Sequence, residues 1–323
     1  MSTTRRLALV LVIAAVAGCV GATVDSQAPI DQTASGSWIV RAPMPTARQE
    51  VAVAALGSRI YVIGGIGAGA EAAATVEVYD VPSDRWEARA PYPVPVHHAA
   101  AAVVGGRLFV MGGYTGGRVG WTRLATVHEY DVARNAWVQR ASMLTQRGAL
   151  AATAVGDRIH ALGGDSDGVT GAHEVYDVRA DRWTRAATMP TARDHLAATT
   201  VGGRVWAIGG RTGFFGTQYP NVEIYDPATD SWRVGQPLPE GRGGLTAAAI
   251  GDRVYVFGGE APLKIFNASE MYETAGNRWI AKAPMPTPRH GIGAAVVGGR
   301  IYIAGGATSP GFARTDAHEV FTP

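Results

Sequence analysis

The feature that most constrains this 323-residue chain is a motif that recurs six times, at a period of roughly fifty residues. Each copy has Arg or a substitute, a run of small residues and a Gly-Gly pair, followed by Glu-x-Tyr or a variant of it and, in all but the last copy, by Trp. The Gly-Gly pairs begin at Gly64, Gly112, Gly163, Gly209, Gly258 and Gly305. Short apolar runs punctuated by glycine at this period predict stacked β-units that bury their faces against one another. One large domain is therefore expected.

The spacing shows which parts of the unit are rigid. Ten residues always separate Trp from the next Arg position, sixteen separate that position from Gly-Gly, and seven separate Tyr from Trp. Only the segment from Gly-Gly to Tyr varies, so every insertion falls between the second and third strands. Variable loops on a rigid scaffold are common binding surfaces. The small-residue first strands, such as Ala99 to Ala102, are predicted to line a central channel.

These motifs resemble the Kelch repeat from Trp38 to Phe321. The resemblance implies an all-β fold, a six-bladed β-propeller, over residues 37–323. The last copy ends at Phe321 without a fourth strand, while a spare fragment surrounds Trp38. We expect the N-terminal strand around Trp38 to pair into the last blade and close the ring, because a half-blade would expose a free sheet edge.

The N-terminal segment predicts export. Arg5-Arg6 precede an apolar run that is too short to span a bilayer, so residues 1–18 are predicted to be a signal peptide. Residues 16–19 resemble a bacterial lipobox, which implies a lipidated Cys19; the alternative is an ordinary signal peptide with an incidental cysteine. Cys19 is the only cysteine, which favours lipidation. Residues 19–36 are expected to be a flexible tether, with anchoring at the outer membrane or the periplasmic face of the cell envelope.

Two charged positions vary together among the copies. Five copies have Arg before the first strand and Glu two residues before the aromatic, whereas the second has Val96 and His128. Because both are lost in the same copy, we predict an ion pair within each of five blades. The pairs are Arg48–Glu77, Arg147–Glu174, Arg193–Glu223, Arg242–Glu270 and Arg289–Glu319. A structural role is favoured, since buried charges need partners. The alternative is an Arg ring for an anionic ligand, because in some Kelch proteins Arg at this position grips an acidic peptide.

The candidate binding surface is the loop face. On this face, the second repeat copy is the main candidate for a binding site, because it lacks the Arg–Glu pair and carries the longest insert. Aromatic residues beside Arg are typical of protein and sugar sites; the alternative is that they pack the loops onto their own blades. The candidates are Arg48, His97, His98, Arg118, Trp121, Arg123, Arg147, Arg193, His195, Arg211, Phe214, Phe215, Tyr219, Arg242, Lys264, Arg289 and His290.

Metal and cofactor chemistry is not expected. His97 and His290 follow the Arg position by one residue, but His98 and His195 follow it by two. These unequal positions, without a supporting carboxylate or cysteine spacing, argue against a metal site. The carboxylates at the insert starts, Asp165, Asp167 and Glu260, are possible acid–base groups.

Two functions stay open. The first is a monomeric, non-enzymatic binding module that recognises an unidentified protein or glycan and touches the membrane only through its lipid anchor. The second is a carbohydrate-active enzyme that resembles the periplasmic N-acetylneuraminate mutarotase, with no catalytic residue assigned. A copper oxidase is disfavoured, because the Cys–Tyr crosslink of galactose oxidase cannot form in the mature chain. The net charge of +2 and the lack of a basic stripe argue against a nucleic-acid partner.

Overall fold

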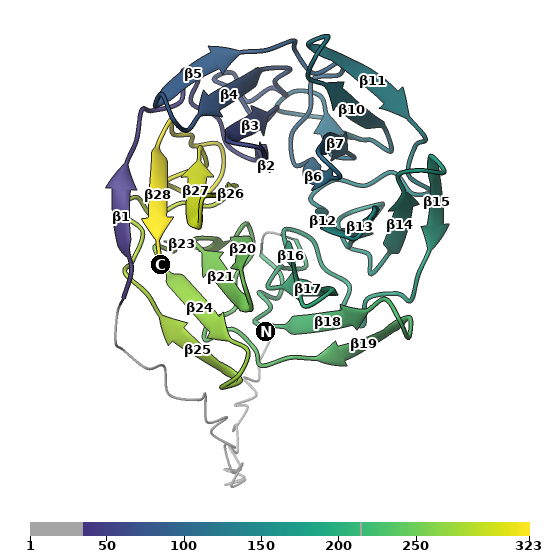
Figure 1. Ribbon diagram of the computed structural model, residues 1–323, viewed down its shortest axis with the longest axis vertical. Helices are drawn as coiled ribbons and strands as arrows, with labels where there is room; N and C mark the ends of the chain where they lie inside the picture. The colour runs from purple at the N-terminus through teal and green to yellow at the C-terminus, as the bar shows by residue number, and fades with distance from the viewer. Residues whose placement is uncertain (1–34, 214) are drawn as a thin grey trace, which may run out of the picture.

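The computed structural model describes residues 35–213 and 215–323. The predicted signal peptide, Cys19, most of the predicted tether and Phe214 lie outside these residues. Six four-stranded antiparallel sheets surround a common axis (Figure 1). The all-β, six-bladed propeller is therefore confirmed. The described residues include no helix with the length and apolar character that a membrane span requires.

Each blade runs from an inner strand at the axis to an outer strand. The first three blades are β2 (Ala52–Leu56), β3 (Arg59–Ile63), β4 (Val76–Asp80) and β5 (Arg85–Ala88); β6 (Ala100–Val104), β7 (Arg107–Met111), β10 (Val127–Asp131) and β11 (Ala136–Arg140); and β12 (Ala151–Val155), β13 (Arg158–Leu162), β14 (His173–Asp177) and β15 (Arg182–Arg185). The fourth and fifth are β16 (Ala197–Val201), β17 (Arg204–Ile208), β18 (Val222–Asp226) and β19 (Ser231–Val234); and β20 (Thr246–Ile250), β21 (Arg253–Phe257), β24 (Ser269–Glu273) and β25 (Arg278–Ala281). The sixth is β26 (Gly293–Val297), β27 (Arg300–Ala304), β28 (His318–Thr322) and β1 (Ser37–Val40).

The sixth blade closes the ring. β1 pairs antiparallel with β28, with Trp38 opposite Phe321, and Figure 1 shows the N-terminal strand on the outside of this blade. The Trp38 Nε1–H donates to the Ala283 carbonyl at 2.8 Å. The other five repeat tryptophans make the same kind of bond, to Ala42, Ala90, Ala141, Ala187 and Gln236. The predicted closure around Trp38 is confirmed.

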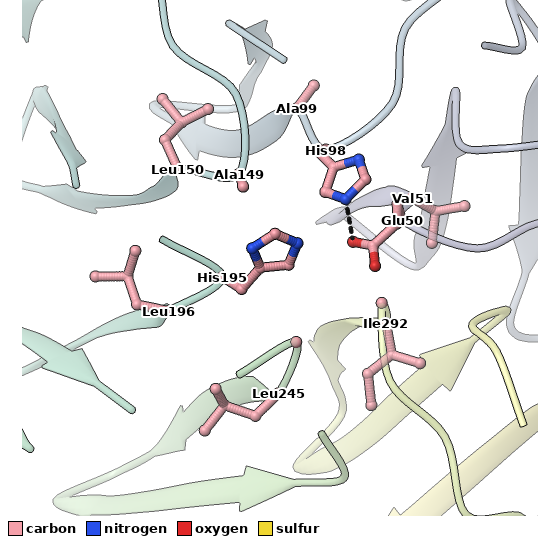
Figure 2. Close-up of a pocket in the computed structure, with 12 residues that line it drawn as sticks. Glu50, Val51, His98, Ala99, Ala149, Leu150, His195, Leu196, Leu245 and Ile292 are labelled. Atoms are coloured by element: carbon pink, nitrogen blue, oxygen red, sulfur yellow. Dashed lines mark ion pairs between the residues drawn. The ribbon is translucent and has the colours of Figure 1, made fainter. Parts of the chain in front are cut away.

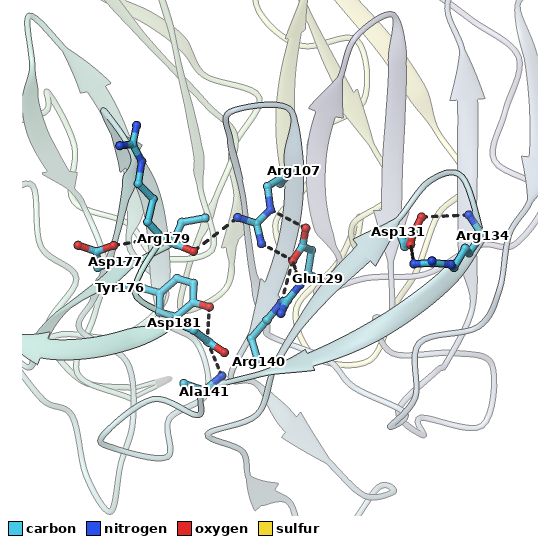
Figure 3. Close-up of polar contacts among 11 residues, drawn as sticks. Arg107, Glu129, Asp131, Arg134, Arg140, Ala141, Tyr176, Asp177, Arg179 and Asp181 are labelled. Atoms are coloured by element: carbon cyan, nitrogen blue, oxygen red, sulfur yellow. Dashed lines mark hydrogen bonds and ion pairs between the residues drawn. The ribbon is translucent and has the colours of Figure 1, made fainter.

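An aspartate that is bonded to a tyrosine of its own blade also links neighbouring blades through a backbone N–H. The Tyr176 hydroxyl donates to Asp181 Oδ1 at 2.5 Å, and the same oxygen accepts the Ala141 N–H at 2.8 Å (Figure 3). The hydrogen bond from Tyr176 is the main cause that lowers the pKa of Asp181. Nearby, Glu129 accepts from both Arg107 and Arg140. These contacts hold the outer strands in register, so the loops rest on a rigid frame.

Small side chains line the centre of the propeller, as the inner-strand composition predicts. A channel of about 360 Å³ runs between the six inner strands, with Ala54, Ala102, Ala154, Ala248 and Ala295 among its lining residues. Larger side chains at these positions would collide, because the six strands converge on one axis.

All five predicted Arg–Glu pairs are present. Four have N–O distances of 2.6 to 3.4 Å, and Arg242 pairs with Glu270 in the fifth. Every one of these arginines is 0% exposed, so their placement on a ligand-binding surface is wrong. The guanidinium groups lie beneath the loop face, where they also bond backbone carbonyls such as Gly64 and Gly163. In the second blade, Val96 is buried and His128 bonds the Tyr92 hydroxyl at 3.0 Å instead.

Because His160 and His318 are buried, we expect the folded protein to lose stability at mildly acidic pH. Burial lowers the pKa of His160 to about 3 and that of His318 to about 4. Near pH 6.5 the unfolded chain gains these protons and the folded chain does not. The free energy of unfolding therefore falls as the pH drops from about 6.5 towards 4, by about 1.4 kcal/mol per pH unit for each group. Denaturant unfolding at pH 7, 6 and 5 measures this fall. His318→Gln should make it shallower, and an unchanged slope would contradict the role given to His318.

Candidate functional site

The six blades are joined on the loop face by a closed ring of backbone hydrogen bonds. In each blade, the residue two after the Arg position donates its N–H to the carbonyl of the equivalent residue in the preceding blade, at 2.8 to 3.0 Å. We call this ring the axial belt. It consists of Glu50, His98, Ala149, His195, Gly244 and Gly291.

All six belt residues have a positive φ, from 49° to 63°. Glycine adopts this conformation freely, as in Gly244 and Gly291, whereas a residue with a Cβ is strained there by about 1–2 kcal/mol. Glu50, His98 and His195 keep this strained conformation and direct polar side chains towards the axis (Figure 2). Strained backbone of this kind is concentrated at functional sites.

A cavity of about 260 Å³ lies on the loop-face side of the belt. We call it the mouth cavity. Below it, a narrower space of about 90 Å³ lies within the belt, and Glu50, His98 and His195 line both. The mouth cavity is lined by Gln49, Glu50, Ile66, His98, Trp121, His195, Arg211, Glu260, His290, Gly311 and Phe312.

The first polar group in the cavity joins the first, second and fourth blades. His98 Nε2 lies 3.4 Å from Glu50 Oε2 (Figure 2). His98 Nδ1 lies 2.5 Å from His97 Nδ1, and His195 Nδ1 lies 2.8 Å from Asp194 Oδ1. Burial is the main cause that lowers the pKa of His97 to about 4 and the pKa of His98 well below its usual value. Both of these imidazoles are therefore neutral at physiological pH.

The second polar group joins the fourth, fifth and sixth blades. Arg211 Nη1 lies 2.5 Å from Glu260 Oε1, and His290 Nε2 lies 3.4 Å from Glu260 Oε2. All three side chains are buried. Burial lowers the pKa of His290, against the smaller opposing effects of Glu50 and Glu260. A carboxylate beside a neutral imidazole is an arrangement that can accept and donate protons.

Aromatic side chains form one wall of the mouth cavity. Trp121 packs against His97 and His98, at ring-centre distances of 4.5 and 5.3 Å. Phe312, from the insert of the sixth blade, meets Trp121 edge-on at 6.5 Å. Arg118 is exposed and lies over Phe312. The predicted second-copy site is thus part of the cavity, although His97 is buried behind Trp121 and does not line it.

Other predicted site residues lie outside the cavity. Arg123 forms an ion pair with Asp165 at 2.9 Å, and Lys264 forms one with Glu240 at 2.6 Å. Phe215 is 83% exposed, and Tyr219 is half-buried on the same insert. None of these four lines the mouth cavity.

Several cavity residues were missed from the sequence. Glu50 occupies the same position after Arg as His98 and His195, so a carboxylate spacing that supports these histidines does exist. The objection that no such spacing exists was therefore wrong. Gln49, which lines the cavity, and Asp194, which bonds His195 from outside the lining, follow the Arg position by one residue, as His97 and His290 do. Aligning the two positions after Arg across all six copies would have found every one of these residues.

Six sheets closed by an N-terminal strand, with a polar cavity where the blade connections meet, define a β-propeller with a ligand-sized site on its axis. The family model described as the KLHDC2/KLHL20/DRC7 Kelch-repeats domain matches residues 29–210 and 149–321. The chain therefore belongs to this Kelch-repeat family. The search of curated proteins gave no significant match.

Among solved structures, the chain is similar to the one titled "Structure of YjhT". The TM-score is 0.75 at 18% identity, and the alignment covers 86% of this chain and 96% of that chain. Identity at this level supports a shared propeller fold and nothing finer.

Proposed function

We propose that the mouth cavity binds a small neutral polyhydroxylated molecule, of the size of a single sugar ring. The observation that carries this proposal is an aromatic wall, Trp121 and Phe312, facing buried carboxylate and imidazole groups across one cavity. Small-molecule sites combine apolar walls with a few fixed polar groups in this way. The protein would then act as a glycan-binding module.

The size of the cavity favours a small ligand. At about 260 Å³ it lies just below the range of about 300–1,000 Å³ that is typical of drug-sized sites. An acidic peptide is the weaker interpretation. The five arginines that such a peptide would contact are fully buried and paired with glutamates.

The charge of the cavity favours a neutral ligand over an anionic one. Its lining holds two carboxylates, Glu50 and Glu260, and one guanidinium, that of Arg211. Arg211 is already paired with Glu260, and the neighbouring Asp194 adds a further negative charge. An anionic sugar would therefore enter a negatively charged site.

Enzymatic sugar mutarotation is the second candidate, and the contact between Glu260 and His290 favours it. Mutarotation needs a base that takes the proton of the anomeric hydroxyl and an acid that protonates the ring oxygen. The ring then opens, the aldehyde group rotates, and closure returns both protons. A carboxylate and an imidazole 3.4 Å apart can take a proton from the sugar and return one to it.

Location at the cell envelope is part of the proposal. It is supported by the predicted signal peptide and the lipobox-like sequence that ends at Cys19. A lipid anchor at Cys19, followed by a polar tether, would hold the loop face within reach of envelope or extracellular glycans. Metabolic labelling with a fatty-acid analogue tests the anchor, and Cys19→Ser should abolish incorporation.

Calorimetric titration of the purified protein with a panel of neutral monosaccharides tests the binding function. Trp121→Ala is expected to weaken binding at least tenfold, because it removes the main aromatic wall. Phe215→Ala is the matched control: it removes an aromatic side chain from the insert of the fourth blade, outside the cavity, and should leave affinity unchanged. Failure of every neutral monosaccharide to bind at millimolar concentration would contradict the proposal.

Exchange between sugar anomers, followed by NMR, separates the two candidates. An enzyme should accelerate the exchange of a bound sugar, and Glu260→Gln should reduce this acceleration by about 10²-fold or more. If a sugar binds but its anomers exchange at the same rate as in buffer, the enzymatic function is excluded and the binding function remains.

A further inference from the structure

We propose that Glu50, His98 and His195 bind a divalent transition-metal ion where the mouth cavity meets the axial belt. One ligand atom from each residue lies within 4.8 Å of the other two. Two imidazoles and one carboxylate are a donor set suited to divalent first-row metals, and they leave positions open for a further ligand. The inference concerns the ion alone and does not depend on the sugar proposal.

The belt explains how residues from three blades converge. Glu50, His98 and His195 occupy equivalent positions, and the ring of backbone hydrogen bonds holds their Cα atoms around the axis. These three residues adopt the left-handed conformation even though they have a Cβ. In the fifth and sixth blades the equivalent residue is glycine, which adopts this conformation without strain. The positions are thus fixed by backbone contacts before any ion binds, as a preorganised site requires.

The hydrogen bonds behind the two imidazoles suit metal ligation. His195 Nδ1–H donates to Asp194 at 2.8 Å, which leaves the lone pair of Nε2 available. His98 shares an Nδ1–Nδ1 hydrogen bond with His97. In the tautomer in which His98 donates, its Nε2 is an acceptor, and this atom lies 3.4 Å from Glu50 Oε2. A hydrogen-bond acceptor behind each ligating histidine is the usual arrangement around protein metal ions.

The distances and charges are compatible with one ion. Atoms that bind the same ion at about 2.1 Å can be at most about 4.2 Å apart, so a small side-chain rotation closes the 4.8 Å spread. Glu50 can make this rotation because its side chain faces the mouth cavity. Three carboxylates, those of Glu50, Asp194 and Glu260, surround the site with one guanidinium, Arg211, and this excess favours a cation.

Titration with Zn²⁺ and Co²⁺ tests the proposal. The protein is the purified full-length chain without a histidine tag and with Cys19→Ser, since Cys19 is its single thiol. We expect one ion per chain at micromolar affinity or tighter, a visible Co²⁺ absorption spectrum, and a melting temperature that rises with Zn²⁺. His98→Gln and His195→Gln should each weaken binding at least 100-fold. Asp194→Asn should weaken it about 10–100-fold through the orientation of His195.

His290→Gln is the matched control. It removes an imidazole from the same cavity but from outside the proposed ligand set. Because His290 Nε2 lies 4.0 Å from Glu50 Oε1, Zn²⁺ affinity should change far less than in His98→Gln or His195→Gln. Wild-type protein that binds neither ion would overturn the proposal. Binding that survives both His98→Gln and His195→Gln, or that is lost in His290→Gln, would also overturn it. The spectrum and the melting shift of the wild type serve as readouts that do not require any variant to fold.

Discussion

Arg193→Met is expected to lower the free energy of unfolding by about 3–5 kcal/mol. The Arg193 side chain is 0% exposed and donates to Glu223 at 2.6 Å and to the Gly209 carbonyl at 2.7 Å. Methionine has no donor, so the buried Glu223 keeps a hydrogen bond from Thr191 but loses its counter-charge. Guanidinium-induced unfolding of the two proteins measures the difference.

Two further variants show whether the lost charge partner is the cause. Arg193→Met combined with Glu223→Leu should recover part of the loss, because apolar replacement of both partners removes the uncompensated charge. The second blade, with Val96 and His128, demonstrates that the fold accepts a blade without this pair. Arg233→Met, at an exposed position on β19 of the same blade, should change stability by less than about 0.5 kcal/mol. A double variant as unstable as the single one would contradict the ion-pair explanation.

Trp38→Ala is expected to cost about 3 kcal/mol, at the lower end for loss of a large aromatic side chain because Trp38 is only partly buried. It removes the contacts with Phe257 and Phe321 and the hydrogen bond to Ala283. Because β1 is the strand that closes the ring, its loosening exposes the edge of β28. We therefore expect concentration-dependent association as well as a lower melting temperature.

Trp232→Ala separates the two effects. Trp232 makes the same kind of hydrogen bond, to Ala187 at 2.7 Å, but its strand β19 follows β18 directly within the fourth blade. We expect Trp232→Ala to lose about as much stability as Trp38→Ala but not to associate. Val40→Ala, which shortens a side chain that is 71% exposed on β1, should be neutral. Size-exclusion chromatography at several concentrations, with thermal unfolding, measures both effects. Association of Trp232→Ala to the same degree would contradict the closure argument.

The fold could be predicted because its signals are local and repeated. Each Gly-Gly pair, Tyr and Trp recurs at a fixed spacing, and the unpaired fragment at Trp38 matches the missing strand after Phe321. The Arg–Glu contacts could also be predicted, since the second copy lost both members together. Their burial was harder to judge, because a motif position does not say how deep its side chain lies below the surface.

The candidate site could be predicted only in part. His98, Trp121, His195, Arg211 and His290 were expected on the loop face and do line the mouth cavity. Gln49 and Glu50, which follow Arg48 in the first copy, and Phe312, from the insert of the sixth, were missed, because the residues that complete the cavity around them belong to other copies. The arrangement of the acids and imidazoles follows from the six-fold ring, which brings together positions separated by whole repeats.

The sequence by itself determined the number of blades, the closing strand, the small-residue channel and the Arg–Glu pairs. The blades and the channel follow from spacings that every copy repeats, and the pairs and the closing strand follow from the copies that depart from the pattern, so local chemistry specifies them. Only the tertiary structure decided that Glu50, His98 and His195 meet. Side chains about a repeat or more apart come within a few ångströms only after the backbone hydrogen bonds of the axial belt have closed around the axis.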